Sequence, residues 1–124
     1  EIPLRLVGSE MCIRDRFHAC NLILIEGRAP DVLADLPAPD AVFIGGTKGG
    51  MEAVLDEVLG KNPNARICIS AIALETLGAA IAALTARGLT AEVTQIAVSR
   101  TKPAGRLHLL MANNPIFLIT GTRK

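Results

Sequence analysis

The sequence lacks large aromatic rings almost completely. It has no Trp, no Tyr and only three Phe among 124 residues, although half of its residues are hydrophobic. Its core must therefore be built from Ala, Val, Ile and Leu, which are typical of buried parallel strands covered by helices. The length is sufficient for one domain with a core of its own. These two features favour a single α/β domain.

The sequence also lacks a charge excess and a long apolar run. Its formal net charge is +1, and its basic residues are not gathered into a run with aromatic residues between them. Nothing in this pattern favours nucleic acid as a partner. No stretch approaches the ~18 consecutive apolar residues of a membrane-spanning helix. The first residues lack the layout of a secretory signal. We expect no membrane partner.

Cysteine is scarce and widely spaced. Cys12, Cys20 and Cys68 form an odd set without a CxxC pair, which is typical of thiols in a reducing compartment. We therefore predict a cytoplasmic protein. His18 and His108 have no ligand spacing to any cysteine, and we predict no metal site.

The first sixteen residues differ from the rest. Within them, residues 9–16 fit neither helical nor strand periodicity well, and no capping or turn signal links them to residue 17 and beyond. The string LVGSEMCIRDR within the first sixteen residues resembles, over its whole length, a peptide that recurs in metagenome-derived gene models, where sequencing-adaptor DNA has been translated. We expect residues 1–16 to be a non-native leader and residues 17–124 to be native sequence. The alternative is a natural charged N-terminal arm.

Strands and helices alternate three times along residues 21–88. The predicted strands are residues 21–26 (NLILIE), 41–44 (AVFI) and 66–71 (RICISA). A short helix opened by Pro30 follows the first strand, and longer amphipathic helices ended by Gly60 and Gly88 follow the others. This order favours right-handed crossovers and a parallel sheet.

The end of the chain has a different pattern. Residues 90–100 are predicted to form one long strand, and a polar connection through Lys102, Pro103 and Gly105 leads to a last strand at residues 116–120. Because no helix is predicted between these two strands, we expect them to pair antiparallel.

Five segments resemble the decarboxylating precorrin methyltransferase family of cobalamin biosynthesis, in the same order and spacing. They are residues 21–30 (NLILIEGRAP), 39–46 (PDAVFIGG), 71–77 (AIALETL), 93–100 (VTQIAVSR) and 114–121 (NPIFLITG). The likeness covers residues 17–121. It implies a class I methyltransferase fold, in which a Rossmann-like sheet ends in an antiparallel hairpin, with S-adenosyl-L-methionine as cofactor.

The resemblance also implies a reaction and an assembly. In that family the enzyme methylates carbon 15 of a precorrin, a reduced tetrapyrrole, and removes carbon dioxide from the acetate on ring C. It occurs as a separate, often tetrameric protein or fused to a second methyltransferase domain. Both possibilities stay open for the parent of this chain.

The opening part of that fold is missing from the sequence. The fold begins with a strand, a glycine-rich turn and a second strand ending in an acidic residue, and neither motif is found here. In the family, these two strands lie between those at 21–26 and 41–44, so their absence leaves both edges unpaired. We expect the strand at 21–26 to dock beside 41–44 or to be poorly placed. The chain alone is predicted to be inactive.

The resemblance implies cofactor contacts after two strands. Gly27, Arg28 and Ala29 are predicted to lie against the adenine, because ligands bind beyond the carboxyl ends of parallel strands. The alternative is a plain strand-to-helix turn. Gly45 and Gly46 would let a flat cofactor or macrocycle approach the backbone, or they form only a turn.

Substrate contacts are predicted from the charge of a tetrapyrrole, which carries several acetates and propionates. Basic groups near the pocket would hold these carboxylates. The candidates are the basic residues Lys48, Arg100 and Arg106, together with the polar residues Thr47 and Ser70. The alternatives are a solvated loop lysine, a Ser70 that caps the next helix and a charged surface hairpin. Methyl transfer needs mainly binding and alignment, and we can name no catalytic residue.

Two further hypotheses remain open. The chain could be a non-enzymatic assembly module that uses its exposed strand edge, or a class I methyltransferase acting on another substrate such as RNA, since a fold does not fix a substrate. Binding of S-adenosylhomocysteine separates an enzyme from an assembly module.

Overall fold

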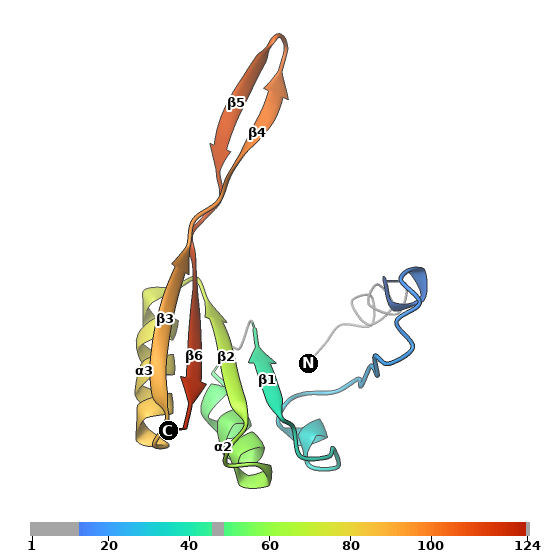
Figure 1. The fold of residues 1–124 in the computed structure, drawn as a ribbon, viewed down its shortest axis with the longest axis vertical. Coiled ribbons are helices and arrows are strands. Elements are labelled where there is room, and N and C mark those ends of the chain that lie inside the picture. The colour runs from blue at the N-terminus through green and yellow to red at the C-terminus, as the bar shows by residue number, and fades with distance from the viewer. Residues whose placement is uncertain (1–12, 46–48, 124) are drawn as a thin grey trace. The chain divides into compact units, whose positions relative to one another are not determined.

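The computed structural model describes residues 13–45 and 49–123, which divide into two compact units after Pro37. The predicted leader at residues 1–16 lies mostly outside the described residues, so its non-native origin stays a prediction. The elements in chain order are η1 (Asp31–Leu33), β1 (Ala41–Ile44), α2 (Met51–Lys61), β2 (Arg66–Ala71), α3 (Leu74–Ala86), β3 (Thr90–Ile96), β4 (Ser99–Ala104), β5 (Leu107–Ala112) and β6 (Ile116–Thr122) (Figure 1).

The first unit corrects the prediction of a strand at residues 21–26. These residues form no strand in the structure, and the side chain of Ile23 is 80% exposed. A strand needs a ladder partner for its N–H and C=O groups, and no described segment pairs with this one. The predicted short helix is a single 3-10 turn, η1, which Pro30 precedes.

The second unit confirms the predicted sheet. Its four strands lie in the order β1-β2-β6-β3, with β1 parallel to β2 and β6 antiparallel to both of its neighbours. The two long helices, α2 and α3, connect β1 to β2 and β2 to β3 as expected. Sequence periodicity located all six of these elements, and each of them except β3 contains at least one buried residue.

Both long helices cover the same face of this sheet (Figure 1). The side chains between these helices and the sheet form the core. Those at most 1% exposed are Leu55, Ala65, Ile67, Ile69, Ala80, Leu84 and Ile119. Among the described residues of the second unit, no helix covers the opposite face. Its side chains alternate with the core positions and include Phe43, Cys68, Ser70 and Leu118. We call these four residues the open face.

The predicted long strand at residues 90–100 is wrong in one respect. The sheet strand β3 ends at Ile96, and Ser99 begins the separate strand β4, which pairs antiparallel with β5. The predicted polar connection is therefore a β-hairpin that projects from the end of the sheet (Figure 1). Every residue of β4 and β5 is exposed, so no alternation of buried and exposed positions marks this hairpin in the sequence.

Candidate functional site

Three residues converge at the carboxyl ends of β1 and β2. Gly45 directly follows β1, and a Cβ placed on it would lie 3.4 Å from the Ser70 Oγ and 3.3 Å from Cε1 of Phe43. Phe43 is 66% exposed, and Ser70 is partly buried. This cluster combines a glycine, a hydroxyl group and an accessible aromatic ring. Its position is the one where parallel α/β sheets bind ligands.

Local geometry explains why these residues meet. Successive side chains of a strand point to opposite faces, so Phe43 and position 45 share the open face. The register places Phe43 beside Cys68, and it therefore brings position 45 beside Ser70. Two predicted site residues, Gly45 and Ser70, are thus neighbours. A larger residue at position 45 would crowd the Ser70 hydroxyl.

The glycine at position 27 is held in a conformation that favours glycine. Gly27 has a φ of +148°, and a Cβ there would overlap Cγ1 of Val32. Arg28 and Ala29 are exposed, and the Arg28 carbonyl accepts a hydrogen bond from the Val32 N–H at 3.1 Å. A turn is present here, which agrees with the alternative of a plain turn, although no strand precedes it. Contact of these residues with adenine stays a prediction, because they belong to the first unit.

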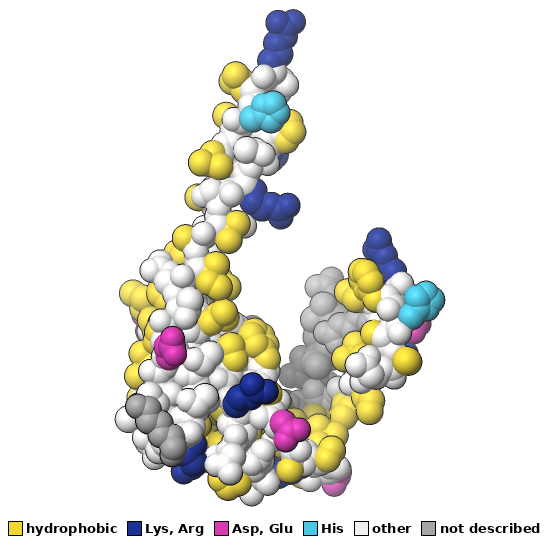
Figure 2. All heavy atoms as spheres, viewed as in Figure 1, with side chains coloured by type: hydrophobic (Ala, Val, Ile, Leu, Met, Phe, Trp, Pro, Cys, Tyr) yellow, Lys and Arg dark blue, Asp and Glu magenta, His cyan; other side chains and the backbone are white. Residues whose placement is uncertain are grey.

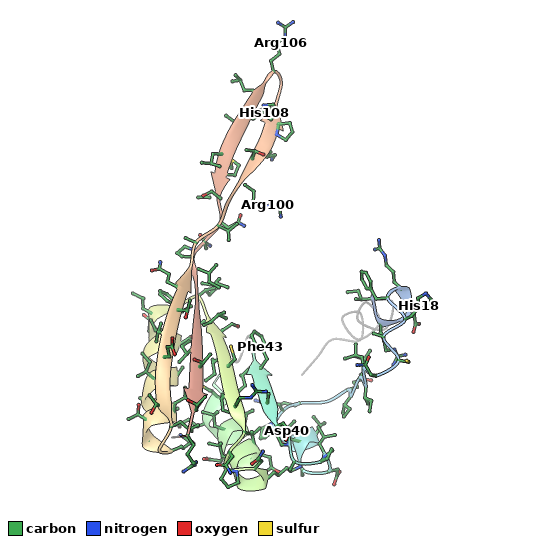
Figure 3. The ribbon with its side chains drawn as sticks, in the orientation of Figure 1. His18, Asp40, Phe43, Arg100, Arg106 and His108 are labelled. Carbon is green, nitrogen blue, oxygen red and sulfur yellow. The ribbon has the colours of Figure 1, made fainter. Side chains whose placement is uncertain are left out.

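The predicted cations Arg100 and Arg106 lie on the hairpin (Figure 3). Arg100 is in β4 opposite Met111, and Arg106 lies in the turn between β4 and β5. Both are exposed. The structure does not bring Arg106 to Ser70, since the turn is at the far tip of the hairpin. Arg100 is nearer to its base, on the side of the sheet where β1 and β2 end.

Three predicted site residues, Gly46, Thr47 and Lys48, lie outside the described residues. Within the described ranges, no group of three or more His, Cys, Asp and Glu side chains is placed to hold a metal ion. None of the helices that the structure describes is long and apolar enough to cross a membrane.

Three apolar residues at this end of the sheet were not among the predicted site residues. Phe43, Ile72 and Leu74 are 66%, 71% and 70% exposed. The AVFI run predicts a buried strand for Phe43, although its two-residue spacing from Gly45 places both on one face. Ile72 and Leu74 lie between β2 and the first turn of α3, where helical periodicity does not indicate which side chains are covered.

The sequence matches the precorrin methyltransferase domain family over residues 13–123. The chain belongs to this family. It is 40% identical over 104 residues to a protein of Pyrobaculum calidifontis named "Probable cobalt-precorrin-6B C(15)-methyltransferase (decarboxylating)", with 82% of this chain and 52% of that protein covered. The chain spans about half the length of the curated relatives it matches.

Solved structures of family members have the same fold. A precorrin-6Y C5,15-methyltransferase of Geobacter metallireducens superposes with a TM-score of 0.91 at 34% identity, over 100% of this chain and 64% of that one. A precorrin 8w decarboxylase of Methanobacterium thermoautotrophicum gives a TM-score of 0.89 at 27% identity, over 98% and 66%. The predicted family and fold class are therefore confirmed.

A methyltransferase family implies S-adenosyl-L-methionine as methyl donor, and the residues present fit part of a site for it. The Phe43 ring and the Ser70 hydroxyl lie close to the Gly45 backbone at the strand ends, where a Cβ on Gly45 would be 3.3 and 3.4 Å from them. The sequence offers no glycine-rich turn after a strand and no acidic residue for the ribose. We therefore derive no reaction step through the cofactor.

Proposed function

We propose that this chain is the later part of an S-adenosyl-L-methionine-dependent methyltransferase that methylates carbon 15 of a precorrin and decarboxylates its ring C acetate. The observation that carries the proposal is the agreement of the whole chain with the Geobacter metallireducens enzyme, at a TM-score of 0.91 and 34% identity. The reaction named for the Pyrobaculum calidifontis relative supports the same substrate class.

The described residues would act by binding and alignment. The cofactor, when bound, supplies the electrophilic methyl group. The backbone at Gly45 admits a flat ligand, and the Ser70 hydroxyl offers a hydrogen bond beside it. Arg100 and Arg106 would pair with substrate carboxylates through charge-assisted hydrogen bonds. Contacts by Gly27, Arg28 and Ala29, and by Gly46, Thr47 and Lys48, belong to the same proposal.

Assembly and compartment are proposed with the function. Cys20 and Cys68 are free thiols, which supports a reducing compartment such as the cytoplasm.

The hairpin supports a homo-oligomer. All residues of β4 and β5 are exposed, and an isolated two-stranded hairpin is only marginally stable in water. Such an exposed apolar surface is typical of an interface between subunits.

The two faces of the hairpin differ in charge. One face, which we call the cationic face, contains Arg100, Lys102, Leu107, Leu109 and Met111. The other face, which we call the neutral face, contains Thr101, Pro103, His108, Leu110 and Ala112. Figure 2 shows hydrophobic and basic side chains interspersed along the hairpin. Two copies would join through neutral faces, where no Lys or Arg has to be buried.

The test joins this chain, as one polypeptide, to the part of the Pyrobaculum calidifontis relative that lies outside the 104-residue match. We expect this fusion to bind S-adenosylhomocysteine in isothermal titration and to methylate cobalt-precorrin-6B with release of carbon dioxide. The chain alone should show no binding at micromolar strength. Micromolar binding by the chain alone would contradict an incomplete site, and a folded fusion without binding would contradict the proposed function.

Substitutions in the fusion test the substrate contacts. Arg100→Ala or Arg106→Ala should raise KM about tenfold or more, because each loses a charge-assisted hydrogen bond. Arg66→Ala is the matched control, since Arg66 is an exposed cation at the opposite, amino end of β2. An equal effect of all three substitutions would assign the effect to overall charge.

A further inference from the structure

The neutral face of the hairpin contains one titratable side chain, the imidazole of His108. This residue is the second of β5, close to the turn, and its register partner on β4 is Pro103 (Figure 3). Cross-strand partners lie on the same face, so this pair continues the face that begins with Thr101 and Leu110. The imidazole therefore belongs to the surface through which two copies would join.

The surroundings of His108 contain cations and no carboxylate. Among the described strands, β5 pairs with β4 and with no other. Residues 97–115 include Arg100, Lys102 and Arg106 but no Asp or Glu. Arg100 and Lys102 lie on the cationic face, and Arg106 lies in the turn, two residues before His108. A protonated imidazole would therefore find no acidic partner on either strand of its own hairpin.

A second copy would not supply an acidic partner either. In a two-fold dimer both subunits use the same patch of surface, so each neutral face would meet another neutral face. The other residues of that face are Thr101, Pro103, Leu110 and Ala112, none of which carries a charge. Each copy would also bring its own His108 to the interface. Two imidazolium groups would then be buried without an opposite charge, which is costly, whereas two neutral imidazoles would not.

We propose that His108 makes self-association of this chain dependent on pH. The copies join through their neutral faces while the imidazole is neutral, and they separate as it takes up a proton. An unperturbed imidazole changes its charge near pH ~6.5, so the response falls in the physiological range. The proposal rests on the homo-oligomer of the proposed function, but it requires neither cofactor nor catalysis.

The sign follows from linkage between proton uptake and association. Burial of the charge disfavours protonation in the associated state, so a fall in pH shifts the equilibrium toward separate copies. A proton that must leave before association raises the dissociation constant up to about tenfold for each pH unit. A dimer buries two copies of His108, so the limiting change is about a hundredfold for each pH unit.

The experiment measures the dissociation constant of the full chain by light scattering at about pH 8 and about pH 5.5. We expect a value at least about tenfold larger at the lower pH, with an unchanged circular dichroism spectrum. The chain has two histidines, and the other, His18, lies in the first unit. His18→Gln is therefore the matched control, and it should keep the full pH dependence.

Two substitutions at position 108 separate charge from shape. His108→Gln keeps a neutral polar side chain and should associate equally at both pH values. His108→Lys carries a permanent positive charge and should remain largely dissociated at both. The proposal is overturned if the original chain associates equally at both pH values or is monomeric at both. It is also overturned if the pH dependence survives in His108→Gln.

The fusion with the Pyrobaculum calidifontis segment distinguishes this proposal from the proposed function. If the fusion methylates cobalt-precorrin-6B but its mass is the same at both pH values, the proposed function stands and the role of His108 fails. If its mass responds to pH through His108 but it neither binds S-adenosylhomocysteine nor transfers a methyl group, the role of His108 stands and the proposed function fails.

Discussion

At the scale of single residues, the packing between β6 and α3 depends on the absence of one side chain. A Cβ on Gly121 would lie 2.8 Å from Cδ2 of Leu84, whose own side chain is fully buried. This distance is shorter than any real Cβ contact, so α3 or the Leu84 side chain would have to shift. Interiors are packed densely, and they accept such a shift only at a cost in stability.

We therefore predict that Gly121→Ala lowers the free energy of unfolding by about 1–3 kcal/mol, as overpacking does. Leu84→Ala alone should cost about 2–5 kcal/mol through the cavity that it leaves. In the double variant the added methyl group occupies part of that cavity, so the two costs should not add. Urea denaturation of the four proteins measures this coupling.

Gly60→Ala is the matched control for this cycle. Gly60 lies in α2, and nothing approaches its Cβ position within 4 Å. Because alanine favours a helix more than glycine, this variant should be more stable by about 0.5–1 kcal/mol. If the free-energy costs of Leu84→Ala and Gly121→Ala are additive in the double variant, the Leu84 side chain moves away from a Cβ at position 121 freely.

The neighbouring positions of Gly45 and Ser70 show what the sequence could predict about the site. Strand alternation and the known order of parallel strands were sufficient to place both at the same end of the sheet. The exposure of Phe43 could not be predicted, because an AVFI run is equally typical of a strand buried on both faces.

At the scale of elements, α2 and α3 are joined by one arginine at the end of α3. Arg87 donates from Nε to the Asp56 Oδ1 at 2.8 Å and from a terminal nitrogen to the Ala83 carbonyl at 2.9 Å. Its hydrogen bond and positive charge lower the pKa of the Asp56 carboxyl below its ordinary value. The pKa of Arg87 is raised by the same hydrogen bond.

The lowered pKa of Asp56 predicts a pH dependence of stability. A carboxyl group whose folded pKa is depressed contributes stability above its unfolded pKa, and this contribution is lost as the pH falls through the folded pKa. Asp56→Asn should therefore be less stable than the original chain near neutral pH. The difference should shrink below about pH 4, the ordinary range of a carboxyl group.

Urea titrations at a series of pH values check this prediction, with Glu57→Gln as the control for loss of one negative charge on the same helix. Since Asp56 is an exposed group, added salt should also reduce the difference. A difference between the original chain and Asp56→Asn that is constant from neutral to acid pH would contradict the role of the ion pair.

The elements with a buried residue were predicted correctly, whereas β3, which has none, was predicted too long and the hairpin was not predicted. The helices α2 and α3 and the sheet strands have apolar periodicity because they pack against each other. Residues 21–26 have the same apolar composition, but a strand is not a local structure and requires a partner. The hairpin of β4 and β5 is the converse case, in which pairing is local and no buried face marks the sequence.

At the scale of the whole molecule, the hairpin determines the expected oligomeric state. Residues 97–115 contain three Lys and Arg residues and no Asp or Glu. Association through the cationic face would bring like charges together, whereas the neutral face offers Leu110, which is 71% exposed, and Pro103. We therefore expect copies of the chain to associate through the neutral face.

Leu110→Asp should convert the chain to a monomer, because a carboxylate on the neutral face would be buried without a partner. Light scattering after gel filtration measures the mass, and Phe43→Asp is the control that should leave it unchanged. Added salt should strengthen association slightly, since it screens the repulsion between Arg100 and Lys102 of adjoining copies. Weaker association at high salt would instead indicate an interface held by ion pairs, and a chain that is monomeric at every concentration would exclude this hairpin as a self-sufficient interface.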